Sequence, residues 1–353
     1  MSSPRTYFHQ LDALRGIACI MVLFHHLVPG ASKYAALGPL GVRLFFVMTG
    51  FLLVGNLLQQ LERGKKRASI LRNFYAKRSI RILPVYVLGF AIVLLSGAEA
   101  AKVVWPAIAT FTINLHMGVT GEWPGNLSHY WFLATNEQMV LALALIVLWL
   151  PGRYLVPALV LLFVGAWLHR WIGTEWGLQP MMVWYSPLSS LDSIAIGGLL
   201  AIFQKSKPEA LDRFVRKPLV AALVWVCLLL AALIRLRLSQ TPLIHLAETL
   251  EALFFGWLII RAAIGFEGPW GKFLTSPVLV FTGMISYALY IFHPLVHSLM
   301  FWAFAKLQLP SQREKPSLII ATFIGSFLAA TLSWYLMEKP LASLKSKTSA
   351  SKT

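Results

Sequence analysis

Long apolar stretches constrain this chain more than any other feature of its sequence. A helix that crosses a bilayer needs about 20 mostly apolar residues, and ten stretches of the chain fit that description. They lie at about 11–28, 39–58, 82–98, 130–150, 154–170, 187–204, 218–236, 243–263, 278–301 and 317–337. The sequence therefore predicts an all-α, polytopic membrane protein with about ten transmembrane helices.

The composition agrees with a membrane protein and argues against a nucleic-acid partner. Of the 353 residues, 58% are hydrophobic and 13% are charged, whereas soluble domains carry about 25% charged residues. The formal net charge is +17, but the basic residues cluster between apolar stretches, as they do in cytoplasmic loops. Cys19 and Cys227 both lie in apolar stretches, which predicts small buried side chains and no disulfide.

The distribution of Lys and Arg predicts the orientation of the chain. With the N-terminus in the cytoplasm, the loops on that side collect more than twice as many basic residues as those on the other side. This bias places both termini in the cytoplasm. The first apolar stretch lacks a cleavage site of small residues, so it is expected to remain as the first helix. Residues 1–342 are interpreted as one transmembrane domain, followed by a short basic tail at 343–353.

A shorter apolar run at about 103–118 contains Pro106 and Asn114. These residues break the run, which favours a re-entrant or interfacial segment over a full span. Such a segment is stable at membrane depth only where protein or water satisfies its backbone polar groups.

The first apolar stretch carries the strongest functional signal, because ionisable side chains within a bilayer are costly. Arg15 and His26 are eleven residues apart, which puts them within about 20° of one helix face and roughly 16 Å apart along the axis. Asp12 lies one turn before Arg15 on nearly the same face, whereas His25 points about 100° away. Taken singly, Asp12 could be a helix cap, Arg15 a side chain that snorkels to the interface, and His26 a partner in an interhelical hydrogen bond. All three on one face of the helix indicate a functional site.

A second signal is a pair of arginines in the segment KRSIRILPVY. Arg78 and Arg81 stand at i,i+3 where a helix enters the membrane. They fit an ordinary excess of basic residues on the cytoplasmic side. They also fit an anion site, because guanidinium groups bind phosphate oxygens in a bidentate manner.

Two further stretches place polar side chains within apolar surroundings. YWFLATNEQ puts Trp131 at a membrane interface and Glu137 about two turns deeper, where a carboxylate needs a cavity. ISYALYIFHPLVH puts Tyr290 and His293 on one face, just before a kinking Pro294. His293 and His297 have a metal-ligand spacing, but no third ligand follows, so we predict no metal site.

Seven segments in order resemble the integral-membrane acyltransferase family 3, bacterial O-acyltransferases of glycans and other acceptors. The resemblance covers about residues 7–342. It is carried by LDALRGIACIMVLFHH, GVRLFFVMTGFLL, FYAKRSIRILPVY, YWFLATNEQ, LDSIAIGGLLA, ISYALYIFHP and MEKP. The essential histidine of the family falls eleven residues after the arginine, so the resemblance assigns that role to His26 and not to His25.

The chain departs from the family pattern in two segments. Arg43 stands where an acidic residue is common, and Thr49 where serine is usual. The glutamate of the family pattern falls on Asn136, with Glu137 one residue later. Either Glu137 takes over the catalytic part of that glutamate, or the enzyme works with His26 alone.

The resemblance implies an O-acyltransferase, with O-acetyl transfer as the expected activity, in the bacterial inner (cytoplasmic) membrane. It implies cytoplasmic acetyl-CoA or another acyl-CoA as donor substrate, no permanently bound cofactor, and a hydroxyl of an envelope or secreted glycan as acceptor. Arg78 and Arg81 would hold the phosphates of coenzyme A, and His26 would act as general base or form an acyl-histidine.

The remaining candidate residues are assigned on the same basis. Arg15 and Asp12 would orient the donor channel or neutralise each other. Trp131, Tyr290, His293 and Glu137 would line the acceptor side. The alternatives are a transporter or flippase of lipid-linked sugars, which would be expected to show paired repeats that this sequence lacks, and a signalling or scaffold protein, which leaves the polar face unexplained.

Overall fold

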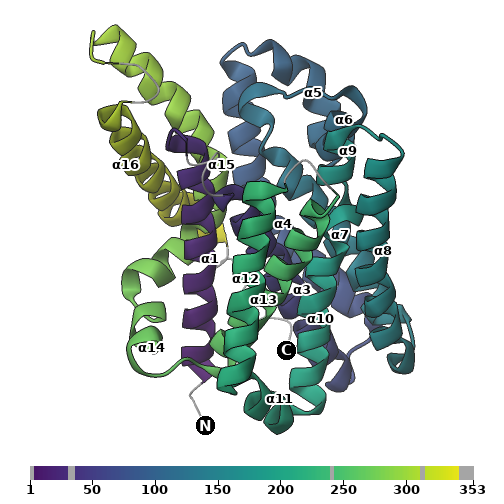
Figure 1. Ribbon diagram of the computed structural model, residues 1–353. Helices are drawn as coiled ribbons and strands as arrows, with labels where there is room; N and C mark the ends of the chain where they lie inside the picture. Colours follow the sequence, from purple (N-terminus) through teal and green to yellow (C-terminus); the bar gives the residue numbers. More distant parts are fainter. Residues whose placement is uncertain (1–3, 31–35, 239–241, 311–314, 342–353) are drawn as a thin grey trace.

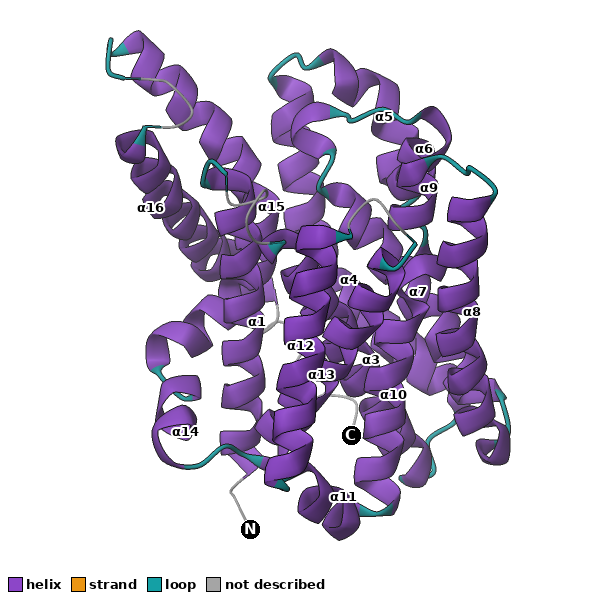
Figure 2. Ribbon diagram, viewed as in Figure 1, coloured by secondary structure: helices purple, strands orange, loops and turns teal. Residues whose placement is uncertain are grey.

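The computed structural model describes residues 4–30, 36–238, 242–310 and 315–341, so the basic tail predicted at 343–353 lies outside the described residues. Within these ranges the chain is helical and contains no strand (Figure 2). Each of the ten predicted stretches corresponds to a long helix, although the ends of several differ by a few residues. These helices are α1 (Pro4–Leu27), α3 (Leu37–Glu62), α4 (Arg67–Leu95), α7 (Tyr130–Trp149), α8 (Leu155–Glu175), α10 (Leu191–Ser206), α12 (Pro218–Arg237), α13 (Ile244–Ile264), α15 (Pro277–Lys306) and α16 (Pro316–Ser333).

The long helices have the length and apolarity of membrane spans. Among the described residues, eight helical segments qualify by themselves, and a ninth qualifies as the pair α13 and α14 (Gly268–Leu274), which meet at 91°. The remaining long helix, α1, is the one that carries Asp12, Arg15, His25 and His26. The all-α, polytopic membrane architecture predicted from the sequence is confirmed.

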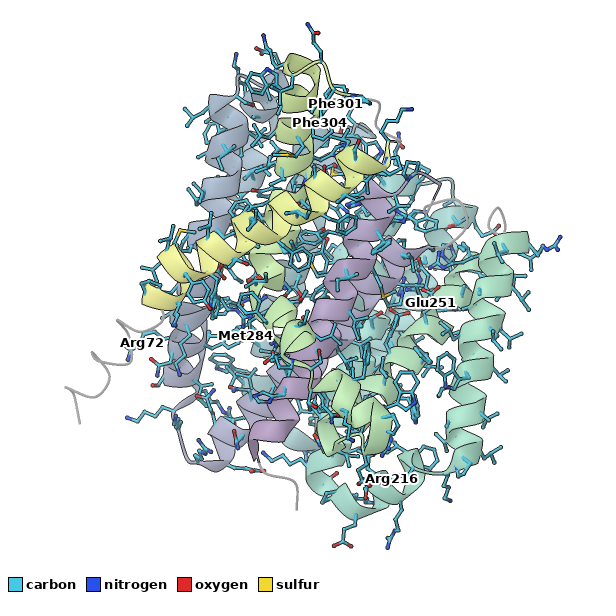
Figure 3. All side chains as sticks on the ribbon, turned by 90° about the vertical axis from the view of Figure 1, so that its left-hand side faces the viewer. Arg72, Arg216, Glu251, Met284, Phe301 and Phe304 are labelled. Atoms are coloured by element: carbon cyan, nitrogen blue, oxygen red, sulfur yellow. The ribbon has the colours of Figure 1, made fainter. Side chains whose placement is uncertain are left out.

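Figure 3 shows where several labelled side chains lie along the bundle. Arg72 and Arg216 lie toward the end at which α1 begins, whereas Phe301 and Phe304 lie at the opposite end, and Glu251 lies between them. Peripheral helices expose apolar side chains, as a bilayer requires. In α12, for example, Leu219, Leu229 and Leu236 are all exposed.

Helix α1 lies in the interior of the bundle, packed against α15 and α3 (Figure 1). Its buried side chains include Ala13, Ala18 and Leu23, and Cys19, whose thiol donates to the backbone carbonyl of Ser286 at 3.4 Å. Cys19 is a free thiol, as is the half-buried Cys227. Although Phe24 is exposed, most side chains of α1 contact protein, and its polar residues Arg15 and His26 line cavities of the bundle.

Glycines bring α1 and α15 into backbone contact. A Cβ atom at Gly16 would lie 2.7 Å from the carbonyl oxygen of Leu279, and one at Gly283 would collide with the carbonyl oxygen of Asp12. Small residues allow such close approach between membrane helices. His26 and His293 each lie ten residues beyond these glycines, and their rings also meet. The two helices therefore run parallel and in step, which places the two histidines together.

The run at 103–118 forms a short helical hairpin, α5 (Glu99–Ala109) and α6 (Ile113–Thr120), at the end of the bundle opposite the start of α1 (Figure 1). Gln138 of α7 donates from its amide nitrogen to the backbone carbonyl of Phe111 at 2.6 Å. It also exchanges hydrogen bonds with Asn114 at 3.0 and 3.1 Å. Side chains of the protein thus satisfy part of the irregular backbone at the turn, as expected for a re-entrant segment.

Candidate active site

His26 lies on the wall of a cavity of about 270 Å³, which we call the histidine cavity. His26 is exposed, and its imidazole lines this cavity. The cavity is lined by residues of α1, α3, α7, α9 (Pro180–Tyr185), α13 and α15, of the segment between α6 and α7, and of the segment after α9. Its walls include Val22, His25, His26, Pro39, Arg43, Phe46, Trp123, His129, Trp131, Trp184, Tyr185, Glu248 and Tyr290.

Four histidines gather at this cavity. The Nδ1 atom of His26 lies 2.8 Å from the Nε2 atom of His293, and their rings are nearly parallel with centroids 5.0 Å apart. The ring of His129 is 5.5 Å from that of His293, and the ring of His25 is 5.4 Å from that of His26. His293 itself is fully buried beneath His26. His26 of α1 and His293 of α15 therefore form one hydrogen-bonded unit, a pairing that the sequence analysis did not predict.

A proline accounts for the orientation of His293. Pro294 lies inside α15 and has no N–H, so α15 cannot form the regular hydrogen bonds at this turn. The proline would have bonded to the carbonyl of Tyr290, four residues earlier. The Nδ1 atom of His293 lies 2.8 Å from this oxygen instead. The sequence FHP thus fixes the ring of His293 through the backbone of its own helix.

A second, smaller cavity of about 160 Å³ contains the predicted arginines, and we call it the arginine cavity. Arg15, Arg78, Arg81 and Glu137 line it. Arg15 binds Asp12 at 2.5 Å, so these two side chains neutralise each other. The guanidinium of Arg78 binds both carboxylate oxygens of Glu137 at 2.5–2.9 Å. Arg81 makes no hydrogen bond or ion pair within the part of the chain that the structure describes, although the carboxylates of Asp12 and Glu338 are near enough to attract it electrostatically.

Tyr290 lies between the two cavities and lines both of them. Its hydroxyl donates to the backbone carbonyl of His129 at 2.8 Å. Its ring packs against Phe132, with centroids 5.2 Å apart, and Phe132 lines the arginine cavity. A molecule that reaches from one cavity into the other must therefore pass these two aromatic rings.

The structure separates the predicted site residues into two groups. His26, Trp131 and Tyr290 line the histidine cavity, and His293 lies directly behind His26. Glu137 does not lie on this side, where we expected it, because its carboxylate is bound by Arg78 at the arginine cavity. The ring of Trp131 packs on Tyr185, with centroids 4.4 Å apart, and Trp123 and Trp184 add further aromatic surface to the histidine cavity.

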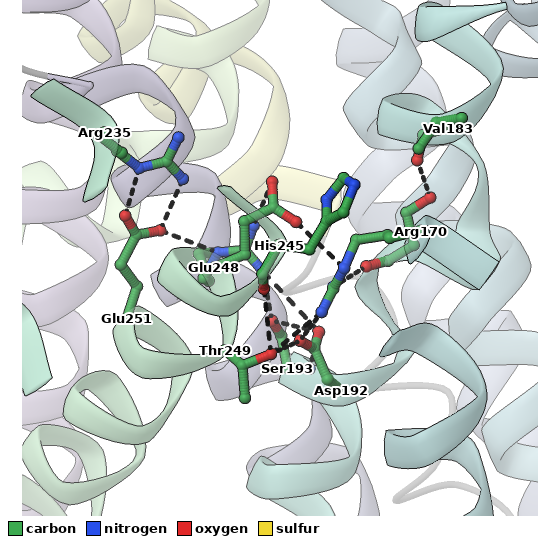
Figure 4. A network of polar contacts seen from close by, with 11 residues as sticks. Arg170, Val183, Asp192, Ser193, Arg235, His245, Glu248, Thr249 and Glu251 are labelled. Carbon is green, nitrogen blue, oxygen red and sulfur yellow. Dashed lines mark hydrogen bonds and ion pairs between the residues drawn. The ribbon is translucent and has the colours of Figure 1, made fainter. Parts of the chain in front are cut away.

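The sequence analysis missed a buried ionic network beside the histidine cavity (Figure 4). Its members alternate in charge and come from α3, α8, α10, α12 and α13. Within the described residues, it joins the arginines Arg43, Arg170 and Arg235 to the carboxylates Asp192, Glu248 and Glu251.

The network is tightly paired and electrically balanced. Arg170 binds Asp192 at 2.8 Å and Glu248 at 3.3 Å, while Arg235 binds Glu251 at 2.5 and 2.9 Å. Arg43 lies 3.2–3.8 Å from all three carboxylates. Buried charges persist only when they are paired, and here three positive charges meet three negative ones. A comparison of all charged residues within the apolar stretches would have revealed this balance.

The described residues contain no group of three or more His, Cys, Asp or Glu side chains that could hold a metal ion. His297, one turn after His293, lies with its Nδ1 atom 3.3 Å from the hydroxyl of Thr322. The chemistry available at the site is that of imidazole, guanidinium, phenol and carboxylate groups.

Comparisons with known proteins agree with the geometry. A family model described as an acyltransferase domain matches residues 8–338. The O-acetyltransferase OatA of Staphylococcus aureus strain NCTC 8325 is 24% identical over an alignment of 319 residues that covers 83% of this chain and 51% of OatA. A candidate O-acetyltransferase of S. aureus strain COL, SACOL0978, is 25% identical over an alignment of 364 residues that covers 95% of this chain and 57% of that protein. The chain spans about half the length of these relatives, and no solved structure matches it.

Proposed function

This chain belongs to the acyltransferase-domain family, and on that premise we propose that it is a membrane O-acetyltransferase. It would transfer an acetyl group from cytoplasmic acetyl-CoA to a hydroxyl of an envelope or secreted glycan. One observation carries this proposal. The arginine cavity and the histidine cavity share Tyr290 as a wall residue, so an anionic donor and a hydroxyl acceptor would lie on either side of it, with His26 on the acceptor side.

The arginine cavity suits the donor. It lies on the side where α4 begins with a highly basic segment, which the distribution of Lys and Arg assigns to the cytoplasm. Arg81 makes no hydrogen bond or ion pair among the described residues, so it can bind a phosphate oxygen of coenzyme A without losing an ion pair. Arg78 and Glu137 form the mouth shared with a neighbouring groove of about 360 Å³, which could hold more of the nucleotide.

The histidine cavity suits the acceptor. Trp123, Trp131 and Trp184 offer flat apolar surfaces, and the polar groups of His26 and Tyr185 fix orientation, a combination typical of small-molecule sites. The cavity volume of about 270 Å³ leaves room for one sugar ring at a time. The acceptor would enter from the side of the membrane opposite the donor.

The reaction needs one proton transfer at His26. The imidazole takes the proton of the acceptor hydroxyl while the hydroxyl oxygen attacks the thioester carbonyl carbon. The new C–O bond forms, the C–S bond breaks, and the coenzyme A thiolate takes the proton from the imidazolium of His26 and leaves as the thiol toward the arginine cavity. In the acyl-histidine variant, the imidazole of His26 first attacks the thioester carbonyl carbon and displaces coenzyme A. The acceptor oxygen then attacks the carbonyl carbon of the acyl-histidine and releases the imidazole. The catalytic role predicted for Glu137 stays a prediction. In the structure its carboxylate binds Arg78 at the arginine cavity.

The direct test is acetyl transfer by purified full-length protein in lipid nanodiscs. Radiolabelled acetyl-CoA is supplied with glycans from the envelope of the source cells, and mass spectrometry locates the acetyl groups. Label on glycan hydroxyls supports the proposal. Movement of lipid-linked sugars without consumption of acetyl-CoA would instead support a flippase and overturn it.

A further inference from the structure

The contacts of His293 determine which nitrogen of His26 is available for chemistry. A backbone carbonyl oxygen can only accept a hydrogen bond. The Nδ1 atom of His293, 2.8 Å from the carbonyl of Tyr290, therefore carries a proton. A neutral imidazole has one N–H and one lone pair, so the lone pair of His293 lies on Nε2.

The contact between the two rings then has one direction. Nε2 of His293 lies 2.8 Å from Nδ1 of His26, and one proton must stand between them. Since Nε2 of His293 accepts, Nδ1 of His26 donates. The lone pair of neutral His26 is left on Nε2, which makes no hydrogen bond within the described residues and belongs to a ring on the cavity wall.

The opposite arrangement would require a positively charged His293. That ring is fully buried. It packs against the rings of His26, His129 and Tyr290 and lies against the backbone carbonyls of Tyr290 and Leu289, none of which carries a full negative charge. The carboxylate nearest to this cavity, Glu248, is bound by Arg43 and Arg170. A buried charge without a counterion is strongly disfavoured, so the neutral pair is the stable one.

We propose that His293 is a positioning residue that holds His26 as the Nδ1–H tautomer. Nε2 of His26 is thereby the atom that takes the proton from the glycan hydroxyl. This inference rests on the proposed function of His26 as the base. Pro294 frees the carbonyl of Tyr290, His293 binds that carbonyl, and His26 binds His293. The chain of contacts takes the place of the carboxylate that orients a catalytic histidine in other enzymes.

The activity test compares two substitutions at one position. Gln at 293 can place an oxygen near the site of Nε2 and accept from His26, whereas Leu cannot. We expect His293→Leu to lower kcat for acetyl transfer about 100-fold, since general-base catalysis contributes roughly 10²- to 10⁴-fold, with an unchanged KM for acetyl-CoA. The kcat of His293→Gln should stay within about tenfold of that of the unaltered protein. The kcat of the control His297→Leu should equal that of the unaltered protein. Equal losses in the Gln and Leu variants, or no loss in Leu, would overturn the proposal.

A spectroscopic test does not depend on turnover. The full chain labelled with ¹⁵N-histidine is examined in nanodiscs by long-range ¹H–¹⁵N correlation NMR, with the signals of His26 assigned from the His26→Ala variant. We expect a protonated Nδ1 and an unprotonated Nε2 in His26, and an Nε2–H tautomer would overturn the inference. If the unaltered protein transfers no acetyl group, the proposed function fails, while the tautomer result still decides this inference.

Discussion

The histidine cluster and the ionic network border the same cavity but are held together by opposite means. The network joins three arginines and three carboxylates through full charges, with almost every group bound on more than one side. The cluster joins His26 and His293 through neutral rings and a backbone carbonyl, and leaves Nε2 of His26 without a partner among the described residues. The charges of the network are bound to one another, which suits a structural role. The cluster keeps one nitrogen, Nε2 of His26, available for a reaction.

The largest effect should follow from removing that reactive atom. We expect His26→Ala to lower the rate of acetyl transfer by about 10²- to 10⁴-fold without lowering the unfolding temperature, because the ring contacts a cavity on one side. Transfer to a defined glycan acceptor and thermal unfolding in detergent measure the two quantities. His25→Ala, which changes a neighbouring ring on the same cavity, is the matched control and should keep much of the activity. Equal losses in the two variants would contradict the assignment.

The next largest effect should be on stability and should come from the network. Asp192 is completely buried and is bound by Arg170 and Thr249. Asp192→Asn leaves Arg170 and Arg43 short of a counter-charge, and breaking a buried pair in this way costs about 3–5 kcal/mol. Thermal unfolding of the purified protein measures this loss.

The control for the network is an exposed ion pair on α5. Glu99 binds Lys102 at 2.6 Å, and both side chains are largely in solvent. Glu99→Gln should change the stability by less than about 1 kcal/mol. If Asp192→Asn were as stable as Glu99→Gln, the network would not be the support that the comparison assumes.

A smaller effect is expected at the arginine cavity, where the loss of one arginine should change the binding of acetyl-CoA and not the rate of the chemical step. We expect Arg81→Ala to raise the KM for acetyl-CoA about tenfold or more, since a hydrogen bond to a charged group contributes about 1.5–3 kcal/mol, with little change in kcat. The effect should weaken at high salt. Arg72→Ala, on the exposed surface of the same helix, serves as control. An unchanged KM in Arg81→Ala would remove this cavity as the donor site.

The smallest predicted effect concerns the aromatic wall of the histidine cavity. Trp131→Ala should raise the KM for the glycan acceptor about three- to tenfold, as expected from the loss of about 0.5–1.5 kcal/mol of aromatic contact. The KM for acetyl-CoA should stay the same, because Trp131 lines the histidine cavity and not the arginine cavity. Initial rates at varied acceptor and donor concentrations test this, and a change confined to the donor would contradict it.

Local patterns in the sequence were enough to predict much of this molecule. The lengths of the apolar stretches predicted the long helices. The spacing of Arg15 and His26 predicted a polar face on α1, and both residues line cavities of the bundle. The run at 103–118 was predicted to be a re-entrant or interfacial segment and forms the α5–α6 hairpin. Pro106 and Asn114 lie inside these two helices, and the break falls between them at residues 110–112.

Contacts between distant segments could not be predicted in this way. Whether Glu137 faces the acceptor or Arg78 depends on how α4 packs on α7, which spacing within one helix does not specify. The pairing of Arg170 with Asp192 depends on the packing of α8 against α10 in the same manner. The bond between His26 and His293 was also hidden, although the glycines that set it, Gly16 and Gly283, are visible in the sequence.

The most direct test of the central claim is the sidedness of transfer in sealed proteoliposomes of the full-length protein. Radiolabelled acetyl-CoA is enclosed inside, the glycan acceptor is added outside, and protease cleavage of the N-terminus identifies vesicles with that end inside. We expect label on the external glycan with the unaltered protein and none above background with His26→Ala. Label that appears only when donor and acceptor share one compartment, or that appears equally with His26→Ala, would contradict the account.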